Sequence, residues 1–134
     1  MDAVHWFLFG IVGLAVGLVA YVWWCLRRRR RLPARERRRL QRSWEYAVSV
    51  RDPVLRVLEA EKVVDQLLGS LGYRGSFGEK LTAAGPRLRD VEALWRAHKL
   101  RNRLAHEPGV RIAAKEAQRA VRAFGDTLAA FMRS

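Results

Sequence analysis

The first hydrophobic segment of the chain is an apolar run from Val4 to Leu26 that contains no charged side chain. A helix rises about 1.5 Å per residue, so a run of this length can cross a hydrocarbon core of roughly 30 Å. Trp6 near its start and Trp24 near its end fall where the two lipid–water interfaces favour amphipathic rings. We therefore expect a single transmembrane anchor at residues 1–26. A cleaved signal peptide is the alternative, but the basic residues follow the apolar run instead of preceding it.

The remaining hydrophobic positions repeat with the period of an α-helix, and no stretch alternates as a β-strand does. The helices are separated by residue types that favour helix ends. We expect a connector helix at about 34–50 and a helix at about 53–71 that is capped by Asp52. A short helix should follow, from the capping box of Ser76 and Glu79 to Gly85-Pro86. The last two expected helices run from Asp90 to about 106 and from about 113 onward. The predicted class is all-α, with a single transmembrane helix followed by a small four-helix bundle. We divide the chain into the anchor at 1–26, a basic juxtamembrane connector helix at 27–51 and the bundle at 52–134.

The formal charge of +13 is concentrated beside the apolar run. The segment from Arg27 to Arg42 contains ten arginines and one glutamate, and it begins with Arg27, Arg28, Arg29, Arg30 and Arg31. Positive residues beside a membrane helix remain on the cytoplasmic side. The expected location is therefore the inner or plasma membrane, with the N-terminus outside and the C-terminal domain in the cytoplasm. The same five arginines can contact anionic lipid or RNA phosphates, and the adjacent headgroups favour lipid.

Three glycines share one face of the predicted membrane helix: Gly10, Gly13 and Gly17. The spacing of Gly13 and Gly17 allows two helices to approach closely, although glycine is common in membrane helices without such a role. A second copy would also help the small bundle to bury a core, so we expect a homodimer. The single cysteine, Cys25, excludes a disulfide framework.

The helix that begins at Asp90 changes from apolar to polar toward its C-terminal end, where Arg101, Asn102 and His106 occur. Asn102 and His106 are four residues apart and can share a hydrogen bond, and the long Arg101 side chain can reach across to them. Arginine offers a forked donor to a phosphodiester, and histidine can transfer a proton near neutral pH. We interpret His98, one turn before Asn102, as a hydrogen-bonded core histidine.

The sequence Arg-Asn-Arg-Leu-Ala-His at 101–106 resembles the Arg-Asn-x-x-x-His signature of HEPN domains. These are small helical bundles of bacterial and archaeal RNA-directed defence and toxin systems, and the wider stretch 55–131 looks like HEPN-type domains as well. The resemblance implies a metal-independent endoribonuclease without a cofactor, whose active site forms between two protomers. Arg101 would then bind the scissile phosphate, His106 would be the general acid or base, and Asn102 and His98 would support them. It also implies RNA as a ligand and an antitoxin or other protein as a partner.

The same residues also allow a structural interpretation without catalysis. Arg101 would pair with an acid such as Glu107 or Asp65, and His106 would end the helix, where the helix dipole tolerates a cation. The protein would then be a membrane-anchored adaptor whose bundle dimerises or binds another protein. A metal site is not expected, because His98 and His106 are far apart in the sequence and no carboxylate cluster joins them.

Overall fold

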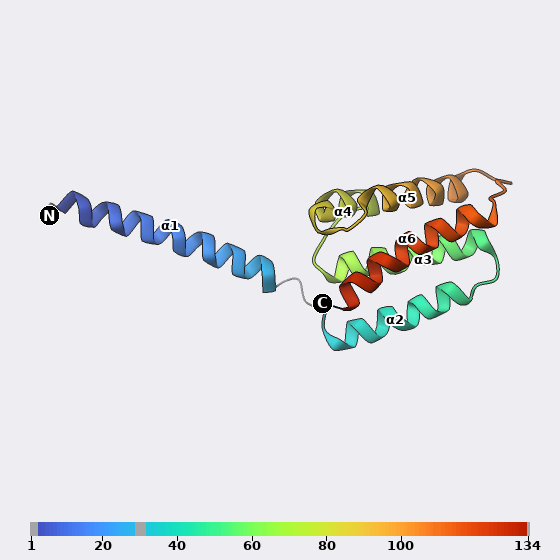
Figure 1. Cartoon of the computed structure of the whole chain (residues 1–134), viewed down its shortest axis with the longest axis horizontal. Coiled ribbons are helices and arrows are strands. Elements are labelled where there is room, and N and C mark those ends of the chain that lie inside the picture. Colours follow the sequence, from blue (N-terminus) through green and yellow to red (C-terminus); the bar gives the residue numbers. More distant parts are fainter. Residues whose placement is uncertain (1–2, 29–31, 134) are drawn as a thin grey trace. The chain divides into compact units, whose positions relative to one another are not determined.

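The computed structural model describes residues 3–28 and 32–133, with the side chains of 4–24 and 32–133. These residues are almost entirely helical and include no strand, which confirms the predicted all-α class. The elements are α1 (Ala3–Arg28), α2 (Ala34–Ser49), α3 (Pro53–Ser70), α4 (Phe77–Ala84), the 3-10 turn η1 (Gly85–Arg87), α5 (Val91–His106) and α6 (Ala114–Met132) (Figure 1). The chain divides into two compact units, Met1–Arg31 and Leu32–Ser134.

Helix α1 is long and apolar enough to cross a membrane, and none of the residues in Val4–Trp24 is buried. A Cβ added at Gly10, Gly13 or Gly17 would meet no atom of the described residues within 4 Å, so this face has room for a neighbouring helix. Arg29, Arg30 and Arg31, and the side chains of Arg27 and Arg28, lie outside the described residues.

Helix α2 packs into the second unit instead of standing apart as a connector. Its residues Leu40 and Ala47 are buried in a cluster with Leu67 of α3 and Leu128 of α6. The half-buried Trp44 lies between these two α2 residues in sequence and packs on the same cluster. The compact unit therefore begins at Leu32 rather than at residue 52, and it contains α2 to α6 rather than the four helices expected. Helix α2 joins the unit because the apolar residues at positions 40, 44 and 47 have helical spacing and form one stripe. The many arginines of this segment make that stripe difficult to recognise in the sequence.

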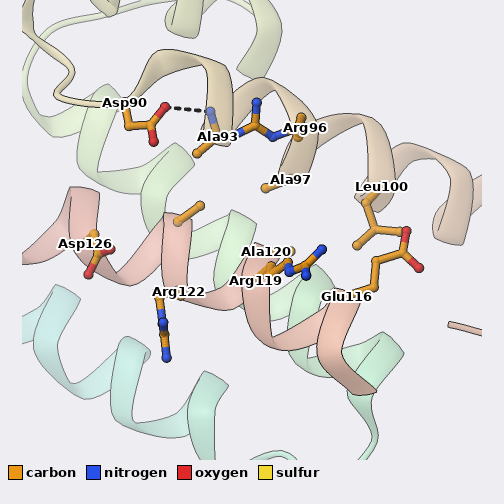
Figure 2. A pocket seen from close by; sticks show the side chains of 11 residues that line it. Asp90, Ala93, Arg96, Ala97, Leu100, Glu116, Arg119, Ala120, Arg122 and Asp126 are labelled. Carbon is orange, nitrogen blue, oxygen red and sulfur yellow. Dashed lines mark hydrogen bonds between the residues drawn. The ribbon is translucent and has the colours of Figure 1, made fainter. Parts of the chain in front are cut away.

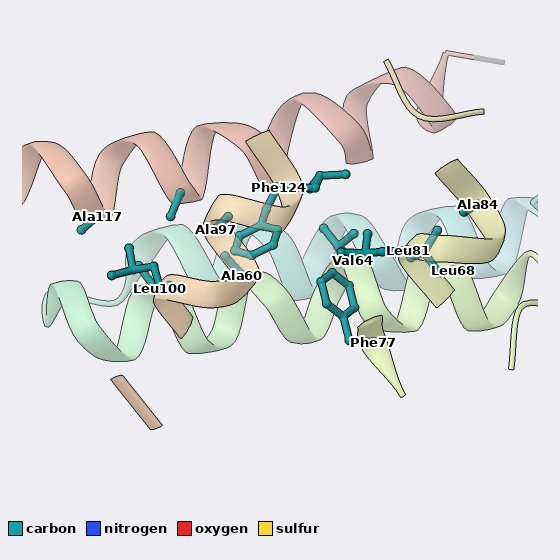
Figure 3. Packing of buried hydrophobic residues seen from close by; sticks show 13 residues of the cluster. Ala60, Val64, Leu68, Phe77, Leu81, Ala84, Ala97, Leu100, Ala117 and Phe124 are labelled. Carbon is teal, nitrogen blue, oxygen red and sulfur yellow. The ribbon is translucent and has the colours of Figure 1, made fainter. Parts of the chain in front are cut away.

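The larger hydrophobic cluster fills the space among α3, α4, α5 and α6. Figure 3 shows Phe77 of α4 and Phe124 of α6 at its centre, and their rings meet edge to face with centroids 6.2 Å apart. Helix α3 contacts α2, α4, α5 and α6, whereas α2 contacts only α3 and α6 among the larger helix–helix interfaces. Helices α3 and α6 therefore form a middle layer, with α2 on one side and α5 on the other (Figure 1).

The helix ends follow the signals in the sequence. Asp52 Oδ1 accepts a hydrogen bond of 2.8 Å from the backbone N–H of Val54, at the start of α3. Ser76 and Glu79 form a reciprocal capping box at the start of α4. Asp90 accepts from the first turn of α5 and so fixes where that helix begins. The predicted helix starts are thus confirmed, and the register of α5 follows from its cap.

Candidate functional site

Four polar side chains form a closed ring of interactions between α3 and α5. Glu61 comes from α3, and His98, Arg101 and Asn102 come from α5. His98 Nδ1 lies 2.9 Å from Glu61 Oε2, and Asn102 Nδ2 lies 3.2 Å from His98 Nε2. Arg101 Nη1 donates to Asn102 Oδ1 at 3.4 Å, and Arg101 Nε lies 3.0 Å from Glu61 Oε1. Each side chain of the ring therefore touches two others.

The ring specifies which groups donate and which accept. Asn102 accepts from Arg101 through its carbonyl oxygen, so its amide N–H points at His98. His98 Nε2 must then be an acceptor, and its ring proton sits on Nδ1 and points at Glu61. A neutral imidazole with an ionised Glu61 satisfies all of these contacts. The structure thus gives His98 the role of a hydrogen-bonded interior histidine that holds Asn102 and Glu61 in place.

Glu61 is the one charged residue that is buried among the described residues, with 5% of its surface exposed. Burial raises the pKa of Glu61 above its ordinary value, while the hydrogen bond from His98 and the charge of Arg101 oppose that shift. The Nε–H of Arg101 is buried and makes no well-aligned hydrogen bond, so its contact with Glu61 is an ion pair. The Glu61 carboxylate thus holds Arg101 at Nε.

Glu61 was not among the residues predicted for the site. It lies in the buried stripe of α3 between Val57 and Val64, at spacings of four and three residues. An acid at a core position requires a partner, because an unpaired buried charge is costly. An acidic residue at an otherwise apolar position of the helix is therefore the sequence signal that indicates a buried polar ring.

His106 does not join Arg101 and Asn102 within one chain. It is the last residue of α5, it is exposed, and it makes no hydrogen bond or ion pair with the described residues. The expected hydrogen bond between Asn102 and His106 is not formed, because Asn102 binds His98 one turn earlier on the same face. Of the predicted trio, the structure brings together only Arg101 and Asn102.

The two acids that the sequence offers as ion-pair partners for Arg101 either bind another residue or are exposed. Asp65 Oδ1 accepts from Lys80 Nζ at 2.8 Å, and Glu107 is exposed just after α5.

An open depression of about 440 Å³ lies over the ring, lined also by Lys62, Asp65 and the loop and helix start at 75–78. Both positively and negatively charged side chains line this depression. An anion there would meet Arg101 and Lys62 but also the two carboxylates.

A second depression of about 440 Å³ lies between α5 and α6 (Figure 2). Its floor is made of small and apolar side chains, and its rim holds three arginines and three acids. The rim residues are Asp90, Arg96, Glu116, Arg119, Arg122 and Asp126. It contains none of the predicted site residues, and its charges balance.

The chain matches none of the protein-family models, curated proteins or solved structures with which it was compared. The resemblance to HEPN domains is therefore carried by the sequence motif alone. Within the described residues, no group of three or more His, Cys, Asp or Glu side chains gathers as metal ligands would.

Proposed function

We propose that this chain is a membrane-anchored HEPN-like protein that acts on RNA at the cytoplasmic face, as a metal-independent endoribonuclease. The observation that best supports this proposal is how Arg101 is held. Glu61 and Asn102 engage its Nε and Nη1, while the side chain stays 30% exposed at the open depression. None of the described residues accepts a hydrogen bond from Nη2. A guanidinium held at two of its three nitrogens can present its remaining N–H groups to a phosphate oxygen in a defined direction.

The proposed reaction needs no group beyond the chain and its RNA. The RNA 2′-hydroxyl attacks the adjacent phosphate, Arg101 stabilises the charge that develops on the phosphate oxygens, and the 5′-oxygen leaves. The 2′-hydroxyl loses a proton and the leaving 5′-oxygen gains one, so the products are a 2′,3′-cyclic phosphate and a 5′-hydroxyl. His106 is the general base or the general acid for these transfers, and solvent water exchanges any proton that it does not. Because His106 does not contact Arg101 within one chain, we propose that a second copy completes the site, as the HEPN resemblance implies.

A non-catalytic role is the second candidate, and one observation favours it. The buried Glu61 already provides Arg101 with a counter-ion, and the ring of Glu61, His98, Asn102 and Arg101 is complete without a ligand. In that case the ring stabilises the contact between α3 and α5. The protein would then be an anchored adaptor whose bundle binds another protein.

The experiment that separates the two candidates is RNA cleavage in the presence of EDTA, with the full chain in lipid nanodiscs. Wild type should release products that end in 2′,3′-cyclic phosphate. His106→Ala should cleave at least about 100-fold more slowly. It should keep its helical circular dichroism, since His106 is exposed and unbonded among the described residues. Lys99→Ala, an exposed position on the same helix, is the matched control and should retain activity.

Two results would reject the ribonuclease. Wild type and His106→Ala could be equally inert on varied RNAs while folded and dimeric, which supports the adaptor. Alternatively, cleavage could be unchanged in both His106→Ala and Arg101→Ala, which would mean that the activity resides elsewhere.

Membrane anchoring and orientation are tested separately from activity. We expect the full chain to stay in the membrane fraction after an alkaline carbonate wash, and the Leu32–Ser134 fragment to be released. A protease added to intact cells should leave the C-terminal domain uncut. Digestion of that domain from outside would reverse the proposed orientation.

A further inference from the structure

Helix α2 presents four exposed arginines on the side that faces away from the bundle: Arg35, Arg38, Arg39 and Arg42. At 100° per residue they fall within an arc of about 100°. The buried Leu40 lies outside that arc. Of the four, only Arg39 pairs with an acid in the described part of the chain, at 3.5 Å from Glu36. Because α2 is fixed on α3, these charges form a rigid array on the folded unit rather than a flexible basic tail.

The array is placed at the end of α2 that follows the membrane segment. Farther along, the same face carries Glu45, Tyr46 and Ser49, so its basic character is confined to the first part of the helix. Residues 29–33 separate the end of α1 from the start of α2. At no more than about 3.6 Å per residue, this connection spans roughly 20 Å even when fully extended. If α1 spans the membrane, the four arginines are tethered close to the headgroups.

We propose that this outward face of α2 binds an anionic phospholipid surface and thereby turns the α5 site away from the membrane. Helix α5 lies on the other side of the α3–α6 layer from α2 (Figure 1). A bundle that docks through α2 therefore exposes Arg101 and His106 to the cytosol. The inference rests on the proposed membrane anchoring, and it holds whether or not the site cleaves RNA. Lipid is favoured over RNA because the tether holds these charges within reach of the headgroups, where each basic side chain is attracted to anionic lipid.

The test uses the full chain in nanodiscs of phosphatidylcholine alone or of phosphatidylcholine mixed with phosphatidylglycerol. A donor fluorophore is placed by Tyr46→Cys on α2 or by Glu92→Cys on α5, in a Cys25→Ser background, and the acceptor is a headgroup-labelled lipid. Both labelled positions are exposed in the folded unit. With phosphatidylglycerol, energy transfer from the label at position 46 should exceed that from position 92. High salt should reduce the difference, since these charges are exposed.

Two charge variants show whether the effect belongs to α2. The variant with Arg35→Gln, Arg38→Gln, Arg39→Gln and Arg42→Gln should lose the difference between the two labels. The matched control makes the same change at four exposed arginines elsewhere on the unit and so has the same net charge: Arg74→Gln, Arg96→Gln, Arg111→Gln and Arg119→Gln. It should keep the difference. A loss of equal size in both variants would show a general effect of charge and would overturn the proposal.

The remaining outcomes separate this inference from the anchoring on which it rests. Insertion into the discs with equal transfer from the two labels overturns the docking of α2 and leaves the anchor intact. Recovery of the protein outside the discs overturns both. Equal transfer together with an RNA mobility shift that only the α2 variant loses would assign this face to RNA instead.

Discussion

Arg101 Nε on α5 lies 3.0 Å from Glu61 Oε1 on α3, and this pair joins the two helices beneath the candidate site. Glu61 is buried, whereas the Arg101 side chain is 30% exposed. The arginine thus serves the folded bundle and at the same time faces an open depression. Any loss of function on changing Arg101 must therefore be separated from a loss of stability.

We expect Arg101→Gln to lower the free energy of unfolding by about 1–2 kcal/mol at neutral pH, because the buried Glu61 loses an opposing charge. The cost stays below that of a fully buried pair, since Arg101 is partly solvated. The loss should become smaller at acid pH, where Glu61 is protonated. Urea unfolding of the Leu32–Ser134 fragment, which contains both hydrophobic clusters, measures it.

The matched control is Arg103→Gln, two residues along the same helix. Arg103 pairs with Glu116 at 2.9 Å, but both side chains are 45% exposed, so the change should cost less than about 0.5 kcal/mol. Equal losses for the two variants would contradict a special role for the Glu61 pair.

Carboxyl titration followed by NMR should show opposite shifts for two glutamates. Burial raises the pKa of Glu61 above the ordinary 4.5, whereas hydrogen bonds with Ser76 lower the pKa of Glu79 below it. Folding therefore favours the protonated form of Glu61, so its contribution to stability is present below pH 4.5 and is lost as pH rises through its folded pKa. The contribution of Glu79 is present above 4.5 and is lost as pH falls through its folded pKa. A Glu61 pKa at or below that of Glu79 would be incompatible with the buried ring.

Gly125→Ala should destabilise the bundle by about 1 kcal/mol, even though alanine favours a helix. An added Cβ at Gly125 would lie 2.7 Å from Trp44 Cζ2, so the contact between α2 and α6 would have to shift. Gly69→Ala is the control, because its Cβ would meet nothing closer than Lys80 Nζ at 3.7 Å. That variant should be neutral or more stable by up to about 1 kcal/mol. Thermal unfolding of both variants shows whether α2 is packed as the structure places it.

Replacing Gly13 and Gly17 by isoleucine should weaken self-association of the full chain in bilayers by about fivefold or more, if the glycine face of α1 holds two copies together. Energy transfer between differently labelled copies measures this. Ala15→Ile, on the other side of α1, is the control and should leave association unchanged. Unchanged association in the glycine variant would place the dimer contact in the bundle or exclude a dimer.

The ends of the helices could be read from the chain because their signals are local. Asp52, the pair of Ser76 and Glu79, and Asp90 each satisfy backbone N–H groups within a few residues of themselves. The same holds for α1, whose length and apolar composition are properties of one continuous segment. The arrangement of side chains across helices is not local. Asn102 could equally have bonded His106 or His98 by its spacing, and the position of Glu61 on α3 favours His98.

The sequence by itself determined the all-helical class, the helix starts, the apolar first segment and the concentration of arginine after it. Each depends on capping, periodicity or composition within a short stretch of chain. Only the tertiary structure decided that α2 belongs to the compact unit and that Glu61 holds Arg101. It also decided that the α2 arginines and the α5 site lie on opposite sides of the bundle. These outcomes depend on which helix faces are buried against each other, and that is settled by the packing of the whole unit rather than by any single segment.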